Sequence, residues 1–199
     1  MSNSHFSTRY IAVTAMLSAI AFILQFFEFP VPLIPSFVKL DFSELPALIA
    51  AFSMGPLSGV IVCLIKNLLH LTTSSSGGIG ELCNFLLGAA FVLPAGLIYR
   101  HKKTRKKAVI GCLAGAVAMA VFSFPCNMFI TYPFYQAAFF GGSVEPIIGA
   151  YQAILPSVTS LWQCLLIFNL PFTFFKAMCS VAITLLIYKK ISPLLHGRS

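Results

Sequence analysis

The chain has 199 residues, of which 58% are hydrophobic and only 9% are charged, and its mean hydropathy is +0.91. A soluble domain typically carries about a quarter charged residues, so this composition excludes an ordinary water-soluble domain. It indicates an integral membrane protein with several spans. We expect no cleavable signal peptide, because the first apolar run has no small-residue cleavage site at its end.

The first half of the chain contains three apolar runs of unequal length. A helix that crosses the hydrocarbon core needs about 20 residues, and the run at 10–27 comes close to this length. Prolines at 30, 32 and 35 end this run, and we expect residues 28–44 to form an outer loop. The next two runs, 45–54 and 57–71, are separated by Gly55 and Pro56. Neither of these runs spans alone, so we expect short, bent or tightly coupled helices packed inside the protein.

The second half contains three longer apolar runs. The run at 82–99 is followed by a basic loop at 100–107 and then by a run at 108–132. A kink is expected within this run at Pro125. The last run covers 161–188. The segment between them, 133–160, is rich in aromatic residues, glycine and proline, and predicts an external loop with an interfacial segment.

These runs predict an all-α integral membrane protein with six transmembrane helices in a single membrane domain. If both termini are cytoplasmic, ten of the thirteen Lys and Arg residues lie inside, as the positive-inside rule requires. All five acidic residues then fall at or near the outer face. Membrane topology therefore accounts for the net charge of +8, and we expect membrane lipid but no nucleic acid as a partner. The loop 100–107 is suited to contact with anionic lipid.

Motifs for metal binding or catalysis are not found. The six cysteines all lie inside apolar runs without a CxxC pair, and the four histidines are far apart, so we expect no metal site. Neither HExxH nor GxSxG occurs. The chain also has no Walker A pattern. We therefore expect a protein that is not an enzyme and that depends on partner subunits for any ATP hydrolysis.

Two polar residues within long apolar runs have two interpretations each. An ionisable group at membrane depth, such as Lys176, normally faces a cavity or a partner; the alternative is a lysine that snorkels to the outer interface. The amide of Asn127 offers donors and an acceptor, which suit the edge of a heterocycle. The alternative is a hydrogen bond between helices.

A second polar group is predicted near the outer end of the run at 57–71. Lys66 and His70 are four residues apart and share a helix face. Glu81 and Asn84, at the start of the next helix, are close enough in the predicted topology to pair with them. This group is either a structural network at the outer face or a direct contact with a ligand.

Small residues predict a docking face on the first helix. Ala15 and Ala19 have the small-xxx-small spacing that allows two helices to approach closely in lipid. Alanine is common in membrane spans, so this motif alone is weak.

Several segments carry a family likeness: KLDFSELPALIAAFSMGPLSG and LIKNLLHL within 37–71, IGELCNFLLGAAFVLPAGLIYRHKK at 79–103, and PFTFFKA within the last run at 161–188. They resemble the substrate-binding S components of energy-coupling factor (ECF) vitamin transporters, and in particular the riboflavin-specific subfamily. The likeness covers residues 9 to about 188. It implies a six-helix subunit of the bacterial cell membrane that captures riboflavin outside the cell. Its expected partners are a transmembrane coupling subunit and two cytoplasmic ATPases.

The resemblance also implies roles for individual residues. Ala15 and Ala19 would dock against the coupling subunit, and no metal or cofactor is expected beyond riboflavin bound as substrate. The outer loop would close over the vitamin. The residues implied in riboflavin binding are Leu40, Asp41, Glu81, Asn84, Asn127, Thr173 and Lys176.

Two features depart from the family pattern. Thr173 stands where the family usually has asparagine, and a threonine hydroxyl is shorter and makes fewer hydrogen bonds than an amide. The segment 133–160 is longer than expected.

The alternatives to a riboflavin-specific S component are an S component for another vitamin or small heterocycle, a membrane-embedded enzyme, and a stand-alone secondary transporter.

Overall fold

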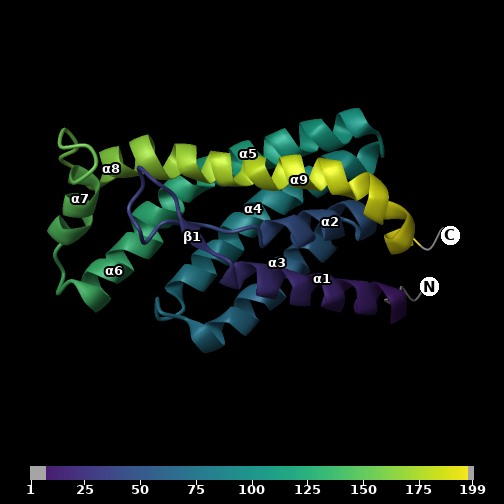
Figure 1. The fold of residues 1–199 in the computed structure, drawn as a ribbon, viewed down its shortest axis with the longest axis horizontal. Helices are drawn as coiled ribbons and strands as arrows, with labels where there is room; N and C mark the ends of the chain where they lie inside the picture. Colours follow the sequence, from purple (N-terminus) through teal and green to yellow (C-terminus); the bar gives the residue numbers. More distant parts are fainter. Residues whose placement is uncertain (1–7, 197–199) are drawn as a thin grey trace.

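The computed structural model describes residues 8–196, with side chains through residue 187, and is mostly helical (78%). Figure 1 shows the long helices running side by side along the long axis of the molecule, with α7 (Glu145–Gln152) across one end. Its elements in chain order are α1 (Thr8–Phe26), β1 (Phe29–Pro30), β2 (Lys39–Leu40), α2 (Glu44–Met54), α3 (Pro56–His70), the 3-10 turn η1 (Leu71–Thr73), α4 (Ile79–His101), α5 (Arg105–Cys126), the π-helical turn η2 (Asn127–Thr131), α6 (Tyr132–Phe139), α7 (Glu145–Gln152), α8 (Leu161–Cys164), the π-helical turn η3 (Leu165–Asn169) and α9 (Leu170–His196).

Among the described residues, five helical segments are long and apolar enough to cross a membrane: Thr8–Phe26, Pro56–Thr73, Ile79–His101, Arg105–Phe139 and Leu161–Ile187. The sixth apolar run forms α2, which has only 11 residues. Every residue of α2 from Glu44 to Phe52 is buried. A helix that is apolar all round belongs inside the protein, and α2 packs against α1, α3, α4 and α9.

The break between α2 and α3 has a local cause. Gly55 has a φ of +108°, in a region that residues with a Cβ rarely adopt. Pro56 follows as the first residue of α3, where its missing N–H costs no helical hydrogen bond. The two helices are therefore separate elements joined by a sharp turn.

Small residues allow close helix packing in the core. A Cβ at Gly115 of α5 would lie 2.3 Å from the carbonyl oxygen of Phe91 in α4. A Cβ at Gly59 of α3 would lie 2.8 Å from the carbonyl oxygen of Ala47 in α2. Both sites place one helix directly against the backbone of the next, as small residues commonly do in membrane proteins.

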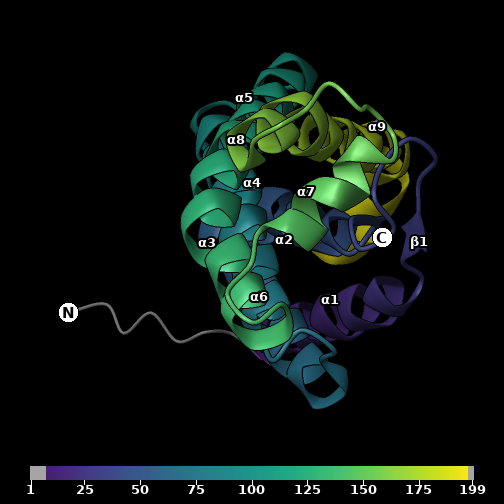
Figure 2. The same cartoon turned by 90° about the vertical axis from the view of Figure 1, so that its left-hand side faces the viewer.

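The structure corrects the prediction for the outer segment 133–160. The helix that begins at Arg105 continues through η2 and α6 to Phe139, and α7 follows. Tyr132, Ile147 and Tyr151 belong to a second hydrophobic cluster, which holds this segment onto the bundle. Figure 2 shows α7 crossing the end of the molecule beside α6. The sequence did not predict these helices, because the aromatic, glycine and proline residues of 133–160 show no helical periodicity.

The outer loop 28–44 contains a short structure that the sequence did not predict. β1 and β2 pair antiparallel, with Phe29 opposite Leu40. They form a two-stranded ribbon in the loop that connects α1 to α2. The orientation of the helices stays a prediction from the positive-inside rule; of the basic residues on which it rests, Arg198 and the side chains of Lys189 and Lys190 lie outside the described residues.

Candidate functional site

Two adjoining cavities lie at the end of the molecule that carries α6, α7 and the β1–β2 loop. The larger has a volume of about 530 Å³ and the smaller about 170 Å³. The residues that line both are Phe37, Gly80, Asn84, Tyr132, Tyr135 and Lys176. These shared walls make the two cavities one two-lobed site.

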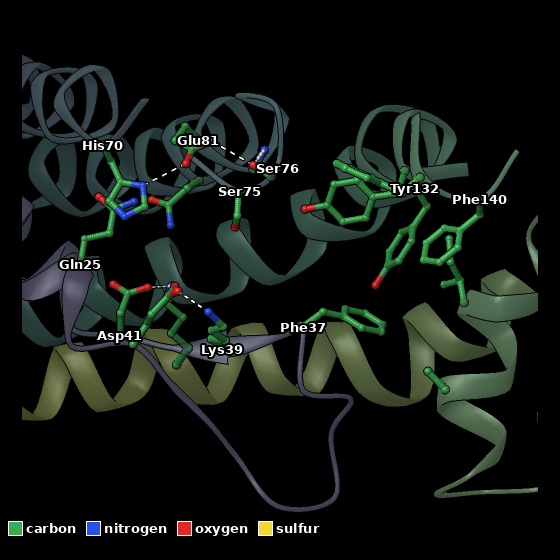
Figure 3. A pocket seen from close by; sticks show the side chains of 18 of the residues that line it. Gln25, Phe37, Lys39, Asp41, His70, Ser75, Ser76, Glu81, Tyr132 and Phe140 are labelled. Atoms are coloured by element: carbon green, nitrogen blue, oxygen red, sulfur yellow. Dashed lines mark hydrogen bonds and ion pairs between the residues drawn. The ribbon is translucent and has the colours of Figure 1, made fainter. Parts of the chain in front are cut away.

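The larger cavity has a polar end and an aromatic end. In Figure 3, Gln25, His70 and Glu81 lie at one end, while Phe37, Tyr132 and Phe140 gather at the other. A concave site with apolar walls and a few placed polar groups is typical of small-molecule binding.

The polar end is organised around Glu81. Its Oε1 lies 2.9 Å from Nδ1 of His70, and its Oε2 accepts hydrogen bonds from Ser74 (2.7 Å) and Ser76 (3.0 Å). The sequence predicted that Glu81 could pair with His70, and the structure confirms this contact. It ties the loop between α3 and α4 to one carboxylate.

A buried charge network lies beside the site. Nζ of Lys176 in α9 lies 2.7 Å from Oδ2 of Asp41 and 3.6 Å from Oε1 of Glu44. Lys66 of α3 lies 3.3 Å from the same Glu44 oxygen and donates to the hydroxyl of Ser43. The network contains two acidic and two basic side chains, so its formal charges balance. Buried charges normally require such pairing.

This network corrects the prediction for Lys66. The sequence placed Lys66 with Glu81 and Asn84, but its side chain is fully buried and turns toward α2 instead. The same network excludes the snorkelling alternative for Lys176, which is 8% exposed and is held by the outer loop.

Asp41 stays ionised in this environment. Burial by itself would raise the pKa of Asp41, but the charges of Lys176 and Lys66 oppose it, together with hydrogen bonds from Lys176 and Ser43. The net result is a pKa well below the usual value of 3.8. The ion pair with Lys176 therefore fastens the outer loop to α9.

The smaller cavity is lined by hydrogen-bonding side chains from three parts of the chain. Asn127 comes from η2, Asn169 from η3 and Thr173 from α9. The Thr173 hydroxyl donates to the carbonyl oxygen of Asn169 at 2.7 Å. The hydroxyl proton of Thr173 is thus used within the helix, and the hydroxyl oxygen presents an acceptor to the cavity.

Asn169 is fixed by two tyrosines. Its Oδ1 accepts from the Tyr151 hydroxyl at 2.6 Å, and its Nδ2 donates to the Tyr132 oxygen at 3.0 Å. The two tyrosine oxygens lie 2.6 Å apart, which closes the ring of hydrogen bonds. Burial raises the pKa of Tyr151, so its proton remains available to Asn169. The ring connects α7 to the wall of the site.

One acceptor in the smaller cavity is unsatisfied. Oε2 of Glu44 is buried and has no hydrogen-bond partner among the described residues, and Glu44 lines this cavity. A buried acceptor without a partner is costly. A bound ligand with an N–H or O–H group could satisfy it.

The structure brings six of the seven predicted binding residues to this two-lobed site: Asp41, Glu81, Asn84, Asn127, Thr173 and Lys176. Leu40 does not line either cavity. It is 3% exposed, because alternation along β2 turns it to the face opposite the exposed Lys39.

Sequence reasoning missed the aromatic wall of Phe37, Tyr132 and Tyr135, and it also missed Asn169 and Glu44. The chain has 20 phenylalanines, so no single aromatic residue stood out. Asn169 could have been found by the signal that identified Asn127, an amide inside an apolar run.

Ala15 and Ala19 line neither cavity and lie on an exposed face of α1. Large apolar side chains flank them, including Met16 (52% exposed) and Ile23 (54% exposed). The face is therefore open to lipid or to another membrane helix.

Across the described part of the chain, no group of three or more His, Cys, Asp or Glu side chains could hold a metal ion.

Comparison with known proteins identifies the family. The model of the family described as "ECF transporter, substrate-specific component" matches residues 9–188. The chain belongs to this family. The family expected from the sequence is thus confirmed, and this S component is a membrane transport protein rather than an enzyme.

Named relatives and a solved structure agree with this assignment. This S component is 33% identical to "Riboflavin transporter RibU" of Staphylococcus aureus over 181 residues, which cover 91% of this chain and 89% of the relative. It is 36% identical to "Riboflavin transporter FmnP" of Bacillus subtilis over 63% of this chain and 67% of that protein. A structure described as the S component of a bacterial ECF transporter aligns with a TM-score of 0.73 and 31% identity, covering 96% of this chain and 99% of that one.

Proposed function

We propose that this S component binds riboflavin outside the cell and delivers it for ATP-driven uptake through partner subunits. The observation that carries the proposal is the relationship over 91% of the chain to a protein named as a riboflavin transporter. The two-lobed site supports it, because riboflavin is a flat ring system with a uracil-like edge and a hydroxylated chain. Such a ligand needs aromatic walls and a few fixed polar groups.

The two lobes suit the two parts of this vitamin. In the proposed arrangement, the amides of Asn127 and Asn84 and the Lys176 ammonium contact the uracil-like edge, and the unsatisfied Glu44 oxygen accepts from a ligand N–H or O–H. The Tyr132 and Tyr135 rings flank the flat ring system. Glu81 and its partners at the polar end of the larger cavity then face hydroxyl groups.

The remaining parts of the proposal concern topology and partners. We place six helices in a bacterial plasma membrane, with α2 as a short sixth helix and with both termini in the cytoplasm. The exposed face around Ala15 and Ala19 docks on a transmembrane coupling subunit, which two cytoplasmic ATPases drive. Energy comes from these partners, because the sequence has no Walker A pattern.

Flavin fluorescence tests the central proposal. Titration of the purified chain with riboflavin, without ATP, is expected to quench the flavin fluorescence and to saturate at one vitamin per chain. Thiamine and biotin serve as control ligands in a thermal-shift assay. Binding of another vitamin without binding of riboflavin would contradict the substrate assignment while leaving the family intact.

A further inference from the structure

We propose that a third cavity, at the end of the molecule opposite the vitamin site, binds the phosphate headgroup of an anionic membrane lipid. This cavity has a volume of about 430 Å³ and lies at the α2–α3 junction, where α1 begins and α4 ends. Figure 1 shows that α1 begins and α9 ends on this side of the bundle. Its polar and charged lining residues are Tyr10, Ser53, Tyr99, Arg100 and Lys103.

Close packing builds the cavity. A Cβ at Gly96 would lie 2.9 Å from the Cα of Pro56, so α4 touches the junction at this point. Arg100 follows Gly96 by about one helical turn and therefore lies beside the junction. On the other side, the Ser58 hydroxyl donates to the Tyr10 hydroxyl at 2.7 Å, which fixes the start of α1 against α3.

The turn itself leaves room for a ligand. A Cβ built at Gly55 would meet no atom within 4 Å, so the backbone of the junction faces open space. A bulky group can therefore approach the main chain between the two short helices without displacing a side chain.

The charge of the cavity favours an anion. Arg100 and Lys103 both line it, and none of its lining residues is acidic. Neither cation forms an ion pair with another side chain in the described part of the chain. An arginine guanidinium matches the geometry of a phosphate and binds it with two parallel hydrogen bonds.

The apolar part of the lining points to a lipid rather than a free anion. The same cavity is also lined by the apolar residues Phe52, Met54 and Leu57. The side chain of Leu57, on α3, is 61% exposed. A headgroup on Arg100 and Lys103 would thus place its acyl chains along an exposed apolar surface. Free phosphate would gain nothing from these side chains.

Lipid retention tests the proposal directly. The purified full chain is equilibrated with vesicles of equal parts phosphatidylglycerol and phosphatidylcholine, and bound lipid is measured by native mass spectrometry. The variant Arg100→Gln/Lys103→Gln is compared with Lys106→Gln/Lys107→Gln, which removes the same charge from the first turn of α5, outside the cavity. A hydrogen bond to a charged group contributes about tenfold to binding, so we expect about a 100-fold loss of phosphatidylglycerol in the first variant. We expect little loss in the second, because Lys106 and Lys107 do not line the cavity.

The outcomes separate the alternatives. Equal loss in both variants, equal retention of the two lipids by the unmodified chain, or no retained lipid would overturn the proposal. If inorganic phosphate released the lipid as effectively as soluble short-chain phosphatidylglycerol, the cavity would be a site for a free anion instead. Thermal unfolding monitors folding of both variants, and neither variant alters the vitamin site.

Discussion

At the residue scale, Lys176 connects the membrane core to the outer loop. Its ammonium group is bonded to Asp41 across 135 positions of sequence, and both side chains are buried. The same lysine lines both lobes of the proposed riboflavin site. One residue therefore holds the loop in place and, in the proposed site, presents a donor to the vitamin.

The first prediction concerns the removal of this charge. Lys176→Ala leaves Asp41 buried with its nearest cation missing, and breaking a buried ion pair in this way costs about 3–5 kcal/mol. We expect a large decrease in the melting temperature and a loss of riboflavin affinity, measured by thermal unfolding and by flavin fluorescence.

A matched control is Lys39→Ala, which breaks the exposed ion pair with Glu28. Exposed pairs contribute about 0–1 kcal/mol, so the melting temperature should change little. Equal destabilisation by the two substitutions would contradict the role assigned to Lys176.

The second prediction concerns pH. Because the folded-state pKa of Asp41 lies below its usual value of 3.8, the ionised carboxylate contributes stability that is fully present above that value. This stability is lost only as the pH falls through the lower folded-state pKa. The difference in melting temperature between the unmodified chain and Asp41→Asn should therefore be the same at neutral pH and at mildly acidic pH.

Comparing this difference, rather than either melting temperature alone, removes the contribution of titrating groups other than Asp41. A difference that shrinks between neutral and mildly acidic pH would show that Asp41 takes up a proton there. The Asp41–Lys176 pair would then not be the stable fastening that the geometry indicates.

At the scale of elements, α1 presents two different surfaces. Its buried residues, including Leu17, Ala21 and Gln25, pack on the bundle, and Gln25 also lines the larger cavity. Ala15 and Ala19 lie on the exposed side. The helix can therefore contact a partner through one face without changing the face that borders the site.

The third prediction separates these surfaces. Ala15→Trp and Ala19→Trp add bulk to the proposed docking face, so each should abolish riboflavin uptake in cells that contain the partner subunits. Riboflavin binding by the purified variant should be unchanged, because neither alanine lines a cavity. Radiolabelled uptake and fluorescence titration provide the two measurements.

Val121→Trp is the matched control for these variants. Val121 is 60% exposed on α5, away from the docking face, and the added ring should leave uptake intact. If an Ala15 or Ala19 variant lost vitamin binding but still assembled with its partners, the docking assignment would be wrong.

At the scale of the whole molecule, the two ends differ in charge and in task. Four acidic residues, Glu28, Asp41, Glu44 and Glu81, outnumber the two lysines Lys39 and Lys176 in the cavities at the α6–α7 end. The cavity at the opposite end is lined by Arg100 and Lys103 and by no acidic residue. The acidic and basic residues that the sequence predicted at opposite faces thus lie at opposite ends of the structure. This arrangement matches the proposed orientation, with vitamin capture outside and basic residues at the cytoplasmic surface.

Much of the site was accessible from residue type alone. Lys176 and Asn127 stood out because a polar group is costly inside an apolar segment. Lys66 stood out by the same signal, but its partner was assigned wrongly. A helix pattern shows which residues share a face and not which neighbouring helix that face meets. The predicted topology placed Glu81 and Asn84 beside His70, and the family resemblance implied their role in binding, as it did for Asp41 and Thr173.

By itself, the sequence determined that this is a helical membrane protein of the S-component family, because hydrophobic length, charge asymmetry and family motifs are properties of the chain. Only the tertiary structure decided that α2 is buried on every side, that α6 and α7 close one end of the bundle, and that Asp41 pairs with Lys176. It alone also revealed the cavity beside Arg100. These features depend on contacts between segments distant in sequence, and no local pattern of hydrophobic or polar residues encodes which segments meet.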